Sequence, residues 1–178
     1  MHISQQFQRW YSGPPQIKLE YARQLCKIVQ ENLWLDGKLH DKLLGLKKSC
    51  EQLSLQMERM EMGKLCSACA TRPDGGCCSA YMADNTDSIQ ILINLLLEKD
   101  ISLRDPVDSE CCFLGPQGCR FMAKPIFCLN YNCTHIMKRT DPQTMKTLEQ
   151  HAAAVLGQQT AIESWLLDRL QHLPLQTI

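Results

Sequence analysis

The stretch LHDKLLGLKKSCEQLSLQMERM, residues 39–60, carries an apolar residue at nearly every third or fourth position. This spacing predicts a helix with one apolar stripe, because a helical turn takes 3.6 residues. The stripe consists of Leu39, Leu43, Leu46, Cys50, Leu53, Met57 and Met60. Such a stripe is typical of a helix that packs within its own domain, and a coiled-coil partner is the alternative interpretation.

A shorter apolar series precedes this stripe and differs from it in phase. Its members are Tyr21, Leu25, Ile28, Asn32 and Leu35. The phase changes by one residue at Asp36-Gly37, a pair that favours turns. We therefore expect residues 16–62 to form an N-terminal helical hairpin, with a single long helix as the alternative.

Residues 141–173 carry the signals of further helices. Asp141 before Pro142 predicts a helix start, and Gly157 predicts the end of that helix. Thr160 and Glu163 have the spacing of a capping box, which predicts that a last helix starts there. In the middle of the chain, residues 89–98 predict one more helix, capped by Asp87 or Ser88. The sequence therefore predicts a mainly α-helical bundle in which the N-terminal hairpin and the C-terminal helices surround a loop-rich centre.

Length and charge restrict the class of protein. The chain has 178 residues, which suits a single domain over 1–178, and 19 Lys and Arg balance 19 Asp and Glu. Zero net charge argues against binding nucleic acid by phosphate neutralisation. The apolar run at residues 89–97 is too short to span a membrane, and the start of the chain has no signal-peptide pattern. We therefore expect a cytoplasmic protein with reduced thiols that associates with neither nucleic acid nor membrane.

Cysteine is the unusual component, with eleven residues of which nine lie between positions 63 and 140. Cys26 and Cys50 stand apart from the others at helical positions, and we expect them to pack as small apolar residues. The others form a first cluster, with Cys-x-x-Cys at 66–69 and Cys-Cys at 77–78, and a second cluster at 111–133. Clustered thiols in a reducing compartment favour zinc, iron–sulfur or copper(I), with disulfides and thiol–redox catalysis as alternatives. We expect residues 63–135 to form a cysteine-rich metal-binding core.

These blocks resemble the YkgJ-type family of zinc- or iron-chelating domains. The first block is CSACATRPDGGCC (66–78), and the second is CFLGPQGCRFMAKPIFCLNYNC (112–133). The resemblance covers about 70 residues, and it implies a zinc or iron–sulfur centre. The ligand positions that it implies are Cys66, Cys69, Cys77, Cys78, Cys112, Cys119, Cys128 and Cys133.

The chain departs from the family pattern at several points, one of which is the replacement of a family aromatic around Phe121-Met122. Seven residues separate Cys69 from Cys77, which is more than the family usually has, and Lys124 replaces the family arginine before proline. Cys111 has no counterpart in the family, so it is either an additional thiol or a replacement for Cys112 as a ligand. His135, two residues after Cys133, is a further candidate ligand.

The functional prediction is a metal-binding protein, with zinc preferred over iron–sulfur for a closed site made of cysteines. One alternative is an iron–sulfur enzyme or redox protein, which the distant similarity to flagellin lysine methylase implies. The other is an interaction module in which the metal is structural and the N-terminal helical stripe binds a protein partner or a second copy. Four basic residues near the cysteines would offset thiolate charge, and these are Arg120, Lys124, Lys138 and Arg139.

Overall fold

The structure is a computed structural model that describes residues 3–70, 78–104, 110–116, 118–129 and 133–173. Its helices in chain order are α1 (Ile3–Tyr11), α2 (Pro15–Asn32), α3 (Gly37–Arg59), α4 (Met62–Ala70), α5 (Ala80–Asp84), α6 (Ser88–Leu96), the 3-10 helix η1 (Ile126–Leu129), α7 (Thr134–Met137) and α8 (Pro142–Leu170). Two short strands, β1 (Leu114–Gly115) and β2 (Gly118–Cys119), form an antiparallel pair. The mainly α-helical prediction is confirmed.

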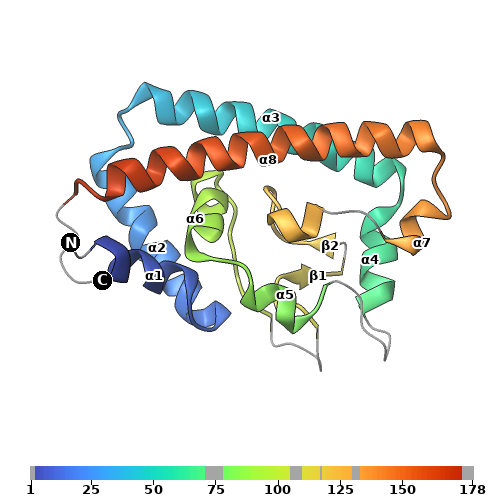
Figure 1. Cartoon of the computed structure of the whole chain (residues 1–178), viewed down its shortest axis with the longest axis horizontal. Coiled ribbons are helices and arrows are strands. Elements are labelled where there is room, and N and C mark those ends of the chain that lie inside the picture. Colours follow the sequence, from blue (N-terminus) through green and yellow to red (C-terminus); the bar gives the residue numbers. More distant parts are fainter. Residues whose placement is uncertain (1–2, 71–77, 105–109, 117, 130–132, 174–178) are drawn as a thin grey trace.

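Helices α3 and α8 form the longest contact of the fold and run antiparallel side by side (Figure 1). The apolar stripe of α3 is buried from Leu39 to Leu53, and α8 buries a matching series that includes Leu148, Val155 and Ile162. Gln158 of α8 donates to Ser49 Oγ of α3 at 2.9 Å, next to this apolar contact. The apolar stripe of α3 therefore belongs to the core of the domain, and α8 covers it within the same chain.

The chain turns at residues 33–36 as expected, but α2 and α3 do not pack on one another as a hairpin. Asp36 caps α3 by accepting from the N–H of Lys38 at 2.9 Å, and α2 then packs mainly on α6 while α3 packs on α8. The reason lies in α6, which buries apolar residues around most of its circumference and so requires cover from more than one helix. The buried face of α2 includes Leu19, Ala22, Leu25 and Val29, whereas the predicted Leu35 is fully exposed.

The prediction of two helices after residue 141 is wrong, because α8 is continuous over 29 residues. Asp141 caps it as expected, accepting from the N–H groups of Gln143 and Thr144 at 3.0 Å. Gly157 does not end the helix, and Thr160 does not start another one. The buried series of α8 continues in phase through this region, so packing on α3 outweighs the cost of about 1 kcal/mol that an interior glycine carries.

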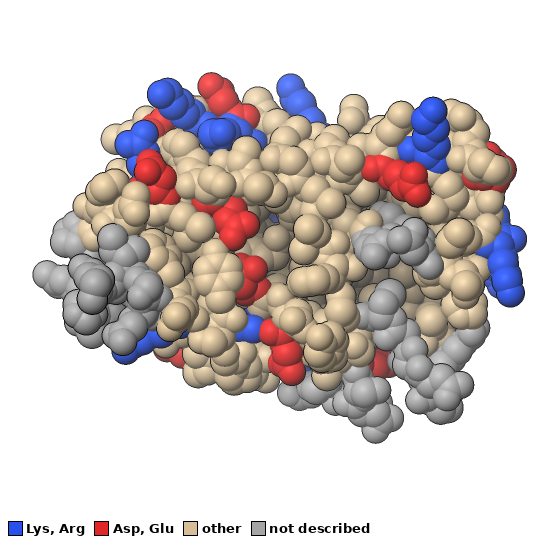
Figure 2. Space-filling view, viewed as in Figure 1, with Lys and Arg blue, Asp and Glu red and all other residues tan. Residues whose placement is uncertain are grey.

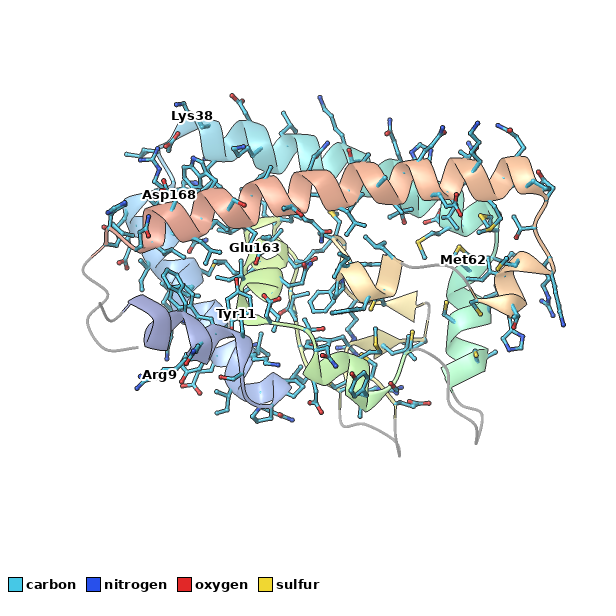
Figure 3. The ribbon with its side chains drawn as sticks, in the orientation of Figure 1. Arg9, Tyr11, Lys38, Met62, Glu163 and Asp168 are labelled. Carbon is cyan, nitrogen blue, oxygen red and sulfur yellow. The ribbon has the colours of Figure 1, made fainter. Side chains whose placement is uncertain are left out.

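Helix α1 is an element that the periodicity did not predict. Its Trp10 is 1% exposed and meets the Phe7 ring edge to face at 4.7 Å. Tyr11 donates to Glu163 Oε1 at 2.8 Å and so ties α1 to the C-terminal half of α8 (Figure 3). Phe7, Trp10 and Tyr11 have helical spacing, and this is the signal that could have predicted the helix.

The surface agrees with the balanced composition. On the part of the face that the structure describes in Figure 2, acidic and basic side chains are interspersed. Among the described helices, none combines the length and apolar character needed to cross a membrane.

Candidate metal centre

The Cys-x-x-Cys motif lies on helix α4, within the centre that the sequence predicts to be rich in loops. Cys66 and Cys69 are three residues apart on this helix, so their side chains lie on the same face. Helix α4 follows a sharp change of direction at Glu61, whose φ is +51°. Because the helix is short and its cysteines are not strong apolar signals, the sequence pattern did not reveal it.

The second cysteine block forms a small hairpin that faces α4. Leu114 pairs with Cys119 across β1 and β2, and the rings of Phe113 and Phe121 lie 4.6 Å apart between centroids. Gly118 in β2 has φ +106°, and a Cβ atom there would be 3.3 Å from the Cα of Gly63 in α4. Two glycines thus allow the hairpin and the CxxC helix to approach backbone to backbone.

Backbone pairing also joins the two cysteine blocks. Cys111 donates its N–H to the carbonyl of Cys78 at 3.1 Å, and Ser79 and Glu110 form an isolated antiparallel bridge. Cys78 at the end of the first cluster therefore lies beside Cys111 at the start of the second cluster. Cys128 lies in η1 and Cys133 at the start of α7, close to the other cysteines. Helix α7 packs on α4.

These elements enclose a cavity of about 200 Å³. Figure 3 shows sulfur atoms gathered in this part of the molecule, between α4, the β1–β2 hairpin and α7. Methionines 57, 62 and 82 add apolar surface to the lining. Seven of the described cysteines line the cavity: Cys66, Cys69, Cys78, Cys111, Cys119, Cys128 and Cys133.

The structure thus brings together six of the eight predicted ligand positions. Cys112 is 5% exposed, belongs to the hydrophobic core and does not line the cavity, whereas the neighbouring Cys111 does. Cys77 lies outside the described residues. The two isolated cysteines behave as predicted, since Cys50 is buried in the core and Cys26 packs against it.

The thiols share one cavity without forming a closed coordination sphere. Within the described ranges, no three His, Cys, Asp or Glu side chains are close enough together to hold a metal ion as they stand. A tetrahedral zinc with Zn–S bonds of about 2.3 Å holds its sulfur atoms about 3.8 Å apart. A single ion would therefore require the cavity side chains to converge on it.

Burial keeps the thiol of Cys111 protonated at neutral pH. It raises the pKa of Cys111 to about 11, and the neighbouring Cys119 and Cys112 add to this shift. Burial also raises the pKa of Cys119, while the positive charge of Lys124 opposes that rise. Because metals bind the thiolate form, metal binding here would release protons.

Hydrogen bonds from three side chains hold the backbone next to Lys124, which lines the cavity. Gln90 and Asn94 of α6 donate to the carbonyl of Ala123 at 2.7 and 2.9 Å, and Asn94 accepts from the N–H of Ala123 at 3.0 Å. Gln159 of α8 donates to the carbonyl of Lys124 at 2.9 Å. We name Gln90, Asn94 and Gln159 the amide clamp.

The other predicted basic residues lie elsewhere. Arg120 donates to the carbonyl and the hydroxyl of Ser102 at 3.1 and 2.6 Å, and the side chains of Lys138 and Arg139 are exposed. Lys124 is the one lysine or arginine among the described residues that line the cavity. His135 contributes to the lining as an exposed side chain of α7.

The contact between the two glycines gives a prediction about the wall of the cavity. Gly118→Ala should lower the free energy of unfolding by about 2 kcal/mol, because alanine is strained at positive φ and its methyl group would press on α4. Gly157→Ala is the matched control, since a Cβ atom there meets open space and the helix gains. Urea unfolding followed by circular dichroism measures both variants, and equal stability of Gly118→Ala and wild type would contradict the close approach.

The comparisons with known proteins leave the family open. No protein-family model matches the chain, and no curated protein or solved structure shows significant similarity to it. The resemblance to the YkgJ-type family accordingly stays a prediction.

Proposed function

We propose that the protein binds zinc or an iron–sulfur cluster through the cysteines of the cavity. The observation that carries the proposal is that seven thiols, supplied by separate segments of the chain, line one largely apolar cavity. Thiolates select zinc, iron–sulfur and copper(I) over magnesium and calcium. The convergence of α4, residue 78, the hairpin, η1 and α7 on one place supports a common ligand for these thiols.

The donor chemistry fits such a group better than it fits disulfide bonding. Cys111, Cys119 and Cys133 form no disulfide bond in the structure. A bound metal would supply Lewis acidity or, as a cluster, electron storage, while the protein supplies thiolates and an apolar surround.

A first experiment measures metal directly in protein purified without oxygen. Elemental analysis and an absorption spectrum distinguish the two members of the proposal. A brown sample with broad visible absorption would identify an iron–sulfur centre, and a colourless sample with bound zinc would identify a closed zinc site. A sample without metal, whose cysteines are mapped as disulfides, would overturn the proposal.

A double variant tests the assignment of the ligands. Cys78→Ser combined with Cys128→Ser removes one thiol from each cysteine block, and metal content should fall to less than half of the wild-type value. Cys26→Ser is the matched control, because Cys26 in α2 packs against the hydrophobic core and does not line the cavity. Equal metal content in the double variant and the control would refute the assignment.

A second candidate function is an iron–sulfur enzyme or redox protein. Three side chains in the lining favour it, because Lys124, Glu58 and His135 place charged and proton-carrying groups beside the thiols. Such an enzyme needs a metal position that the thiolates leave open. A change of the visible spectrum on adding a small metal ligand such as cyanide would support this candidate, and an unchanged spectrum would favour a closed centre.

The third prediction, a helical interaction module with a structural metal, stays a prediction. The stripe of α3 is buried against α8, so a partner cannot reach it in the folded chain. A protein partner would have to use another face.

A further inference from the structure

Cys111 and Cys112 are adjacent in the sequence but differ in their surroundings. Residue 110 pairs in an antiparallel bridge with residue 79, and the chain turns directly after it, because the N–H of Leu114 donates to the carbonyl of Cys111 at 3.0 Å. Cys111 opens this turn and lines the cavity, whereas Cys112 lies within the turn and is buried in the hydrophobic core.

Several contacts place Cys111 on the cavity side. Its side chain is half-buried and lines the cavity, and its N–H is bonded to the carbonyl of Cys78 at 3.1 Å. Its thiol is also close enough to Cys119 for their charges to interact. Cys78 and Cys119 are themselves in the cavity lining, so Cys111 lies among the other candidate ligands.

The position of Cys112 is that of a packing residue. It is 5% exposed and belongs to the same hydrophobic core as Phe113 and Phe121. Apart from the adjacent Cys111, the charge that acts on Cys112 is that of Asp84 in α5. A ligand role for Cys112 would require this segment to rotate and to expose its core residues.

We infer that Cys111, and not Cys112, supplies the thiolate of this segment to the metal centre. The inference rests on the proposed function, and it differs from the family resemblance, which assigns Cys112. The ligand set then consists of Cys66, Cys69, Cys78, Cys111, Cys119, Cys128 and Cys133 among the described residues. Cys112 stabilises the core beneath them.

The first test compares Cys111→Ser and Cys112→Ala in the full chain. Loss of a group that only hydrogen-bonds to a ligand costs about 10- to 100-fold in metal affinity, so loss of a ligand should cost at least as much. We expect a loss of this size for Cys111→Ser in a chelator competition and less than a threefold change for Cys112→Ala. The reverse order, in protein shown to be folded by circular dichroism, would overturn the inference.

The second test measures the reactivity of each thiol in the wild-type sequence. Metal-free protein is treated with iodoacetamide, and the modification of each cysteine is followed by mass spectrometry. Cys111 should react at least tenfold faster than Cys112, and bound metal should protect Cys111 while leaving Cys112 as slow as before. Faster reaction of Cys112 would overturn the inference.

Metal binding by the protein and the ligand role of Cys111 can be refuted separately. Wild-type protein that binds no metal would end the proposed function and, with it, the ligand role of Cys111. Wild-type protein that binds metal and loses it in Cys112→Ala alone would leave the proposed function intact and refute only the inference.

Discussion

Replacing Asn94 with alanine is expected to lower the free energy of unfolding by about 3 kcal/mol. Asn94 is fully buried in α6, and its side chain both donates to and accepts from the backbone of Ala123. In the variant the buried N–H of Ala123 loses its acceptor. An unsatisfied buried donor costs far more than the loss of a hydrogen bond at the surface.

Urea unfolding followed by circular dichroism measures this effect, and Asn85→Ala is the matched control. Both asparagines donate to a carbonyl four residues earlier, at 2.7 Å from Asn85 to Tyr81 and at 3.0 Å from Asn94 to Gln90. Asn85 is exposed, so its replacement should change stability by less than about 0.5 kcal/mol. Equal losses in the two variants would show that the buried pairing with Ala123 is not what stabilises this region.

The same variant should change the cavity. Lys124 follows Ala123 and lines the cavity wall, so a loosened amide clamp leaves its ammonium group less well placed beside the thiols. We expect weaker metal binding in Asn94→Ala than in Asn85→Ala. Unchanged binding would indicate that Gln90 and Gln159 hold this segment without Asn94.

Removing the metal is expected to open the cysteine region while the paired long helices stay protected. A ligand present at a hundred times its Kd stabilises the folded state by about 2.7 kcal/mol, which corresponds to about a hundredfold slower hydrogen exchange where exchange requires the site to open. Structural zinc can contribute of order 10 kcal/mol. The amides of α4, of the β1–β2 hairpin and of α7 should therefore exchange at least about a hundredfold faster in metal-free protein.

Helices α3 and α8 should respond differently, because they bury a continuous apolar contact that contains no cavity cysteine. Their exchange rates should change by less than threefold. Hydrogen exchange with mass spectrometry, before and after chelation, reads both regions in one sample. The Cys78→Ser, Cys128→Ser double variant is the control, and chelation should change its exchange pattern much less than that of the wild type. Equal acceleration in α3 and in α4 would mean that metal and core form one folding unit.

The sequence predicted elements best where a single apolar face decides the structure. The stripe from Leu39 to Leu53 and the Asp141 cap appear in the fold as expected, because periodicity and caps are local signals. Gly157 misled the prediction because its local preference is weaker than the contact between α8 and α3. The uninterrupted phase of Val155, Gln159 and Ile162 was the signal that could have corrected it.

The candidate site could be predicted as a set of residue types but not as an arrangement. Spacing indicated that the cysteines belong together. Which of Cys111 and Cys112 lines the cavity depends on the pairing of residues 79 and 110, which are far apart in the sequence. The amide clamp was missed for a related reason. Asn94 lies in an apolar run, and its partner Ala123 is 29 residues away, so no local pattern reveals the bond.

The unbroken length of α8 makes the protein suitable for distance measurements by fluorescence. At 1.5 Å per residue its 29 residues form a rod of about 43 Å that begins next to α7 and ends beyond the tie to α1. A dye pair at its two ends would report a fixed separation and serve as an internal standard. A second pair, with one dye moved to the exposed Lys64 on α4, would then show directly how far the cavity wall moves when metal binds.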